Sequence, residues 1–150
     1  MTEAHAHHYR GNPVITSAKA TAHCLAGCAI GEVAGLIIAV TMGLSVWSTI
    51  LLTTALAYLF GFTLGLMPVM RDRNKTFIEA LKLIWIGEAI SIGVMEIVMN
   101  AVDYRMGGKQ ADSIFNEVFW IGIAAAVPAG FLAAWPVNWW LLKRDLKACH

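Results

Sequence analysis

The stretch 19-KATAHCLAGCAIGEVAGLIIAVTM-42 decides the class of fold. It is almost wholly apolar and exceeds the roughly 20 residues that a helix needs to cross a bilayer core of about 30 Å. Three later segments have the same character and similar length: 46–70, 77–100 and 117–142. Backbone groups inside a bilayer have no water to bond, so such spans must be helical. The sequence therefore predicts an all-α fold, an integral membrane four-helix bundle.

The composition of the whole chain supports a membrane protein. Of its 150 residues, 58% are hydrophobic and 14% are charged, whereas a soluble domain carries about 25% charged residues. The net charge of +1 offers nothing to attract nucleic acid, and we expect no such partner. We expect a polar, histidine-containing N-terminal tail over 1–18, a four-span transmembrane domain over 19–150 and no cleaved signal peptide.

The basic residues predict the orientation of the spans. Most of them fall on one side of the predicted membrane: Arg10, Lys19, Arg71, Arg73, Lys75, Lys143, Arg144 and Lys147. Arg105 and Lys109 fall on the other side, in a polar loop between the third and fourth spans. By the positive-inside rule, both termini are expected in the cytoplasm of a multi-pass protein in the cell inner membrane.

The first span carries two stripes with helical spacing. Cys24, Cys28 and Glu32 recur at every fourth position and share one face. Beside them lies a stripe of small residues that lets a second helix approach closely: Gly27, Gly31 and Gly35. We expect this span to be the central packing helix, and its glycine face predicts a homodimer. A short similarity between 29-AIGEVAG-35 and 85-WIGEAIS-91 fits either a repeated hairpin or chance.

Acidic residues interrupt the apolar spans. Glu32 and Glu88 fall near mid-membrane and Glu96 lies nearer the outer face. An ionised carboxylate at the bilayer centre costs about 2.5–3.5 kcal/mol on insertion scales unless it is protonated, paired or in contact with water. We expect no Lys or Arg at the depth of Glu32 and Glu88, so a proton, a bound cation or hydrogen bonds must neutralise them. A purely structural hydrogen bond is the alternative.

Several side chains of types that bind metals accompany the glutamates. Thiolate and thioether ligands select Cu(I), while thiolate and imidazole also suit Zn. The candidate metal ligands are His23, Cys24, Cys28, Glu32, Glu88, Met95, Glu96, Met99, Cys149 and His150. This set predicts a soft-metal site, with copper as the first candidate cofactor. We expect the thiols at the cytoplasmic end and the thioethers toward the outer face, so that candidate ligands follow one another from one membrane face to the other. The alternative is packing, because buried Cys and Met commonly fill space in a core.

Motifs of the common catalytic classes do not occur in the sequence. It lacks the nucleophile elbow, the Walker loop, the haem attachment motif and the zinc protease motif, so we expect no enzyme. The predicted function is to bind, and help to transport or sense, a soft transition-metal ion. Two alternatives remain: a structural or accessory subunit of a larger membrane complex, with Asn138 and the glutamates joining helices, or a redox component that binds quinone or haem.

Three separated motifs resemble one known family. They are 23-HCLAGCAIGEVAG-35, 94-VMEIVMNAV-102 and 136-PVNWWLLKR-144, and the resemblance extends over nearly all of the chain after Thr21. The family is an uncharacterised bacterial polytopic membrane family, domain of unknown function number four-three-nine-six. The resemblance implies about four spans and no established activity or cofactor. It singles out His23, Cys24, Cys28, Glu32, Glu96, Asn100 and Asn138, with Asn100 standing where the family motif is more acidic.

Overall fold

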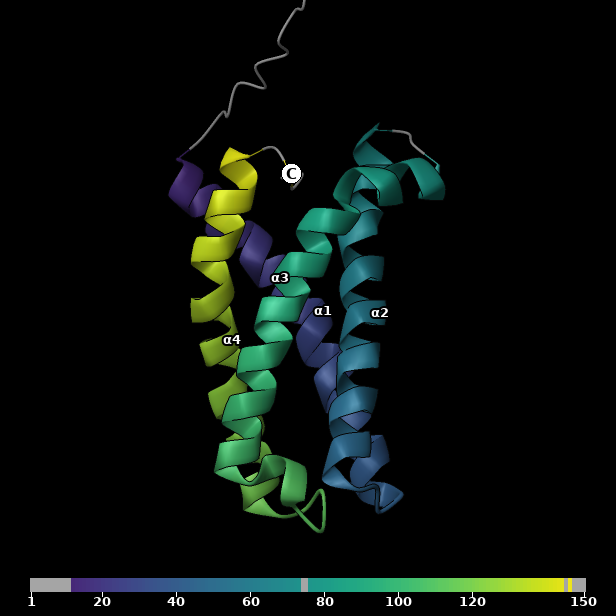
Figure 1. Ribbon diagram of the computed structural model, residues 1–150, viewed down its shortest axis with the longest axis vertical. Helices are drawn as coiled ribbons and strands as arrows, with labels where there is room; N and C mark the ends of the chain where they lie inside the picture. The colour runs from purple at the N-terminus through teal and green to yellow at the C-terminus, as the bar shows by residue number, and fades with distance from the viewer. Residues whose placement is uncertain (1–11, 74–75, 145, 147–150) are drawn as a thin grey trace, which may run out of the picture.

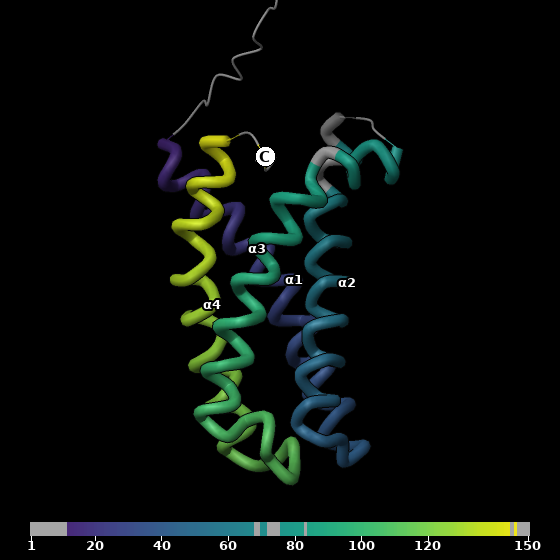
Figure 2. The backbone as a smooth tube through the Cα atoms, viewed as in Figure 1, coloured from purple at the N-terminus to yellow at the C-terminus, as the bar shows by residue number. Residues whose placement is uncertain are grey.

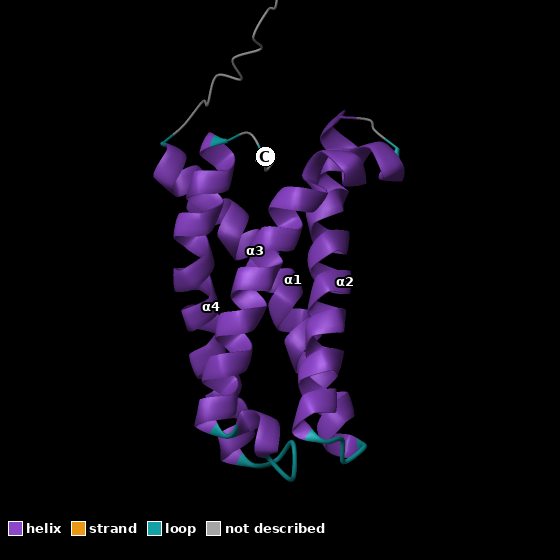
Figure 3. Cartoon of the chain, in the orientation of Figure 1, coloured by secondary structure: helices purple, strands orange, loops and turns teal. Residues whose placement is uncertain are grey.

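The computed structural model describes residues 12–73, 76–144 and 146, which form helices joined by loops and turns, without strands (Figures 1 and 3). The helices are α1 (Pro13–Thr41), α2 (Val46–Arg73), α3 (Phe77–Met106), the short 3-10 helix η1 (Gly108–Gln110) and α4 (Glu117–Lys143). Four segments are long and apolar enough to cross a membrane: Pro13–Thr41, Val46–Met67, Ile84–Met106 and Glu117–Lys143. The predicted all-α fold with four candidate spans is confirmed, and these are features of a multi-pass membrane protein.

The four long helices run alternately up and down (Figure 2). The start of α1 and the end of α4 lie at one end of the bundle, together with the end of α2 and the start of α3. We call this the terminal end. The opposite end, the loop end, holds the turn at 42–45 and the segment 107–116. α1 packs most extensively against α2, and α3 packs most extensively against α4.

Local capping residues set the helix boundaries. α1 begins at Pro13, inside the segment expected to be a tail, because the Asn12 side chain accepts a hydrogen bond of 3.0 Å from the Val14 N–H. α3 runs on to Met106, into the segment expected to be a loop, and Gly107 ends it in the left-handed conformation with φ 85°. Glycine adopts this conformation without a steric penalty.

Large apolar side chains lie on the outside of the bundle. Trp47, Leu51 and Ile97 have 78%, 72% and 72% of their surface exposed. Buried positions include many small or polar residues, among them Ala39, Ala57, Thr53 and Ser91. Helices in a bilayer pack through small residues and turn large apolar ones toward lipid, so this distribution suits a membrane environment.

The glycine stripe of α1 packs against α2 of the same chain. A Cβ atom added at Gly27 would lie 2.7 Å from the Gly61 Cα, and one at Gly31 would lie 2.5 Å from the Ala57 Cα. The two backbones therefore approach as closely as the small residues predict. Because α2 covers the glycine face of α1, a second copy of the chain cannot pack on this face. A homodimer therefore stays a prediction, and it would need another surface.

Candidate functional site

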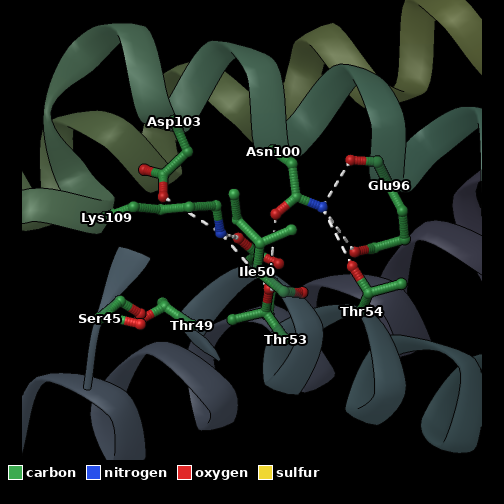
Figure 4. A network of polar contacts seen from close by, with 10 residues as sticks. Ser45, Thr49, Ile50, Thr53, Thr54, Glu96, Asn100, Asp103 and Lys109 are labelled. Atoms are coloured by element: carbon green, nitrogen blue, oxygen red, sulfur yellow. Dashed lines mark hydrogen bonds and ion pairs between the residues drawn. The ribbon is translucent and has the colours of Figure 1, made fainter. Parts of the chain in front are cut away.

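Polar side chains gather inside the bundle near the loop end (Figure 4). Four are charged and almost fully buried: Glu32, Glu96, Asp103 and Lys109 have 0%, 2%, 0% and 4% of their surface exposed. They come from α1, α3 and η1. We call these four, together with Thr53, Thr54 and Asn100, the loop-end cluster.

Lys109 forms the centre of the loop-end cluster. Its Nζ donates a hydrogen bond of 2.6 Å to Glu32 Oε1 and lies 3.6 Å from Asp103 Oδ2. It also donates to the Thr53 hydroxyl at 3.4 Å. The prediction that no Lys or Arg reaches the depth of Glu32 is therefore wrong. η1 folds back against α2, α3 and α4, and this brings a loop lysine into the bundle.

Glycines allow the chain to fold back at this point. After Gly107 has ended α3, Gly108 lies directly against the Asp103 carboxylate, and Gly122 of α4 lies against both the same carboxylate and Gly108. A Cβ atom at either position would clash with Asp103 Oδ1. The sequence signal for this arrangement is 106-MGGK-109, a glycine pair directly before a lysine at a helix end.

Asn100 links the carboxylate of Glu96 to the rest of the loop-end cluster. Its Nδ2 donates to the backbone oxygen of Glu96 at 2.7 Å and to Glu96 Oε2 at 3.2 Å. The same amide group donates to Thr54 Oγ1 at 3.3 Å, and its Oδ1 accepts from Thr53 Oγ1 at 3.5 Å. These contacts connect Glu96, through Asn100 and Thr53, to Lys109 and Glu32.

Sulfur-bearing side chains meet in the middle of the bundle. Cys24 and Cys28 of α1 and Met95 and Met99 of α3 belong to a single buried core cluster, and none has more than 2% of its surface exposed. Cys24 Sγ lies 3.7 Å from the Ser91 hydroxyl oxygen. The prediction put the thiols at the cytoplasmic mouth and the thioethers toward the outer face, whereas the structure places all four in one core.

The other predicted ligands lie elsewhere. The His23 side chain is exposed and its Nε2 lies 3.0 Å from the Leu64 carbonyl oxygen of α2. The Glu88 carboxyl group is buried against Gly65 of α2. Cys149 and His150 fall outside the described residues. Within the described ranges, no group of three or more His, Cys, Asp or Glu side chains is arranged to hold a metal ion.

Asn138 joins α4 to α1, the role that the accessory-subunit alternative gave it. Its Nδ2 donates to Thr21 Oγ1 at 2.8 Å, and both residues are fully buried. One turn earlier in α4, Trp135 Nε1 donates to Ser17 Oγ at 3.1 Å. These bonds hold the terminal-end half of α4 against α1.

The comparisons with known proteins agree with the resemblance of the three motifs. One family model, described as a domain of unknown function, matches residues 15–147. No curated protein and no solved structure matches the chain. Because the family model covers almost the whole sequence, the chain belongs to the family Domain of unknown function (DUF4396).

Proposed function

We propose that this protein is a multi-pass protein of the bacterial inner membrane that binds a soft transition-metal ion, copper(I) first, in the centre of its bundle. Binding there is the step that transport or sensing of the ion requires. The observation that supports the proposal is the single buried core cluster that contains Cys24, Cys28, Met95 and Met99. Thiolate and thioether sulfur atoms are the ligands that select Cu(I).

The geometry favours three of these residues as ligands. α1 and α3 run in the same direction (Figure 1). Cys24 lies level with Ser91, because its Sγ is 3.7 Å from the Ser91 hydroxyl oxygen. Cys28 is one turn beyond Cys24 and Met95 is one turn beyond Ser91, so these two lie at similar depth. Met99 packs instead against Gly130 of α4. We therefore assign Cys24, Cys28 and Met95 as ligands and Met99 as a neighbour.

Copper binding tests this proposal. We expect the reduced, purified protein to bind Cu(I), and the double substitution Cys24→Ser/Cys28→Ser to abolish binding because both thiolates are lost. Met95→Leu should weaken binding at nearly unchanged side-chain volume. Met106→Leu, on the 44% exposed Met106 of the same helix, is the matched control. Competition with a chromogenic Cu(I) chelator measures each affinity, and equal affinities for the wild type and the double variant would rule out the site.

An accessory role in a larger membrane complex is the second candidate. It is favoured by the hydrogen bonds that Glu32 accepts from Lys109 and that Asn138 donates to Thr21. Such bonds between helices stabilise the bundle without a bound ligand. This candidate requires a stoichiometric partner that co-purifies in mild detergent. A homogeneous preparation of this chain alone, with intact copper binding, counts against it.

We also propose that the terminal end faces the cytoplasm. The argument is the positive-inside rule applied to Lys19, Arg71, Lys143 and Arg144, which all lie at the terminal end of the helices. A reporter active only in the periplasm should be inactive at the C-terminus and active when inserted after Asp112 in the loop-end segment. The opposite pattern would reverse the topology and remove the reducing environment that the thiols need.

A further inference from the structure

The four long helices form two pairs at the terminal end. There the start of α1 lies beside the end of α4, and the end of α2 lies beside the start of α3 (Figure 1). In the first pair, Asn138 and Trp135 of α4 donate hydrogen bonds to side chains of α1. In the second pair, Leu66 of α2 packs against Ala80 and Ile84 of α3. Each pair is therefore held together at this end by contacts of its own.

A hydrogen bond from His23 joins the two pairs. The Nε2 atom of His23 lies 3.0 Å from the Leu64 carbonyl oxygen of α2. A carbonyl oxygen only accepts hydrogen bonds, so Nε2 carries the proton and donates it. His23 lies about one turn nearer the terminal end than Gly27, the first glycine of the stripe that packs on α2. The bond therefore extends the contact between α1 and α2 toward the terminal end.

The sequence of α2 explains why the Leu64 carbonyl accepts a side-chain donor. In an α-helix this oxygen would accept from the N–H group four residues further on. That residue is Pro68, which has no N–H, although α2 continues to Arg73. A carbonyl oxygen without a donor is costly inside a membrane, and a helix bends most easily at a proline. His23 therefore supplies the donor that the proline removes, at the position where α2 bends most easily.

We propose that His23 and the Leu64 carbonyl group form a latch that holds the terminal end of the bundle closed over the core thiols. Cys24 directly follows His23, and its Sγ lies 3.7 Å from the Ser91 hydroxyl oxygen of α3. When the latch opens, the end of α2 bends at Pro68, the two pairs separate at the terminal end, and small molecules reach the thiols. The glycine stripe, nearer the loop end, keeps α1 on α2. The latch acts whether or not a metal ion binds to the thiols.

The rate at which a small thiol reagent labels the core cysteines tests the latch. In full-length protein carrying Cys149→Ser, the remaining cysteines are Cys24 and Cys28, which are at most 2% exposed. N-ethylmaleimide should label them slowly in mild detergent, well below the melting temperature. His23→Leu should raise the rate about fivefold, the change in an opening equilibrium expected for one lost hydrogen bond. His23→Gln keeps a donor and should label slowly, as should the control Lys19→Leu, one turn earlier on the exposed side of α1.

Pro68→Ala provides an independent test, because it gives the Leu64 carbonyl group a backbone donor. This variant alone should be labelled more slowly than the parent protein. In its background, His23→Leu should have a much smaller effect, which gives a non-zero coupling in a double-mutant cycle. Equal effects of His23→Leu with and without the proline, or equal labelling rates of His23→Leu and Lys19→Leu, would overturn the latch.

Discussion

Replacing Lys109 with methionine is expected to lower the free energy of unfolding by about 3–5 kcal/mol, the range measured when one partner of a buried ion pair is removed. Methionine keeps most of the side-chain volume but cannot donate the 2.6 Å hydrogen bond to Glu32. The carboxylates of Glu32 and Asp103, both 0% exposed, then lose their shared cation. The loss should come from uncompensated charge more than from altered packing.

Equilibrium unfolding in mixed detergent micelles measures this effect, and two further variants identify its origin. Lys82→Met removes an exposed lysine of α3 and should change the free energy of unfolding by less than about 0.5 kcal/mol. The double variant Glu32→Gln/Lys109→Met removes both charges of the closest pair and should recover part of the loss, which gives a positive coupling energy in a double-mutant cycle. If Lys109→Met is as mild as Lys82→Met, the lysine is not buried in the folded protein.

The number and type of the long helices could be predicted because the bilayer imposes them. An apolar run of the length of Pro13–Thr41 has few alternatives in lipid, and the glycine spacing at Gly27, Gly31 and Gly35 correctly indicated a closely packed face. The partner helix of that face could not be read from the stripe. A small-residue face is equally suited to a helix of the same chain or of another.

The ion pair between Glu32 and Lys109 could not be predicted from the sequence. The depth of each residue in the membrane was estimated from its position along a predicted span. Lys109 lies in the segment between two spans, and this estimate places it at the membrane surface. In the structure the left-handed Gly107 ends α3, and Gly108 and Gly122 leave room for the Asp103 carboxylate, so that Lys109 of η1 reaches Glu32 inside the bundle. The sequence reports a glycine pair but not which carboxylate the reversed segment meets.

The separation of the sulfur-bearing side chains from the carboxylates could not be predicted from the sequence either. The expected series of ligands from one membrane face to the other mixed thiols, thioethers and carboxylates. In the structure these side chains are separated: Cys24, Cys28 and Met95 lie in the apolar core, while Glu32 and Glu96 lie in the loop-end cluster. α1 and α3 run in the same direction, so residues that are the same number of turns along the two helices lie at similar depth. Side chains of the same chemical type on the two helices are therefore brought together.

Substituting Gly31 with alanine is the second change expected to have a large effect, on the order of 3 kcal/mol of lost stability from overpacking. The added Cβ atom would lie 2.5 Å from the Ala57 Cα and 2.6 Å from the Leu56 carbonyl carbon, so it meets backbone that no rotamer change can move. Helices α1 and α2 must separate, which lengthens the contacts along the whole stripe. At other helix positions, replacing glycine with alanine stabilises the folded state by up to about 1 kcal/mol. A loss of stability in Gly31→Ala would therefore come from overpacking and not from helix propensity.

Gly93→Ala in α3 is the matched control for the substitution at Gly31. The new methyl group at Gly93 would meet only the Tyr58 hydroxyl, at 3.0 Å, and that ring end can shift. In equilibrium unfolding by a denaturing detergent, we therefore expect the midpoint of Gly93→Ala to be close to that of the wild type. The midpoint of Gly31→Ala should lie at a much lower detergent concentration. Gly27→Ala, whose Cβ atom would lie 2.7 Å from the Gly61 Cα, should behave like Gly31→Ala. If both stripe variants match Gly93→Ala, α1 does not pack on α2 through its glycines, and the stripe becomes available to a second copy of the chain.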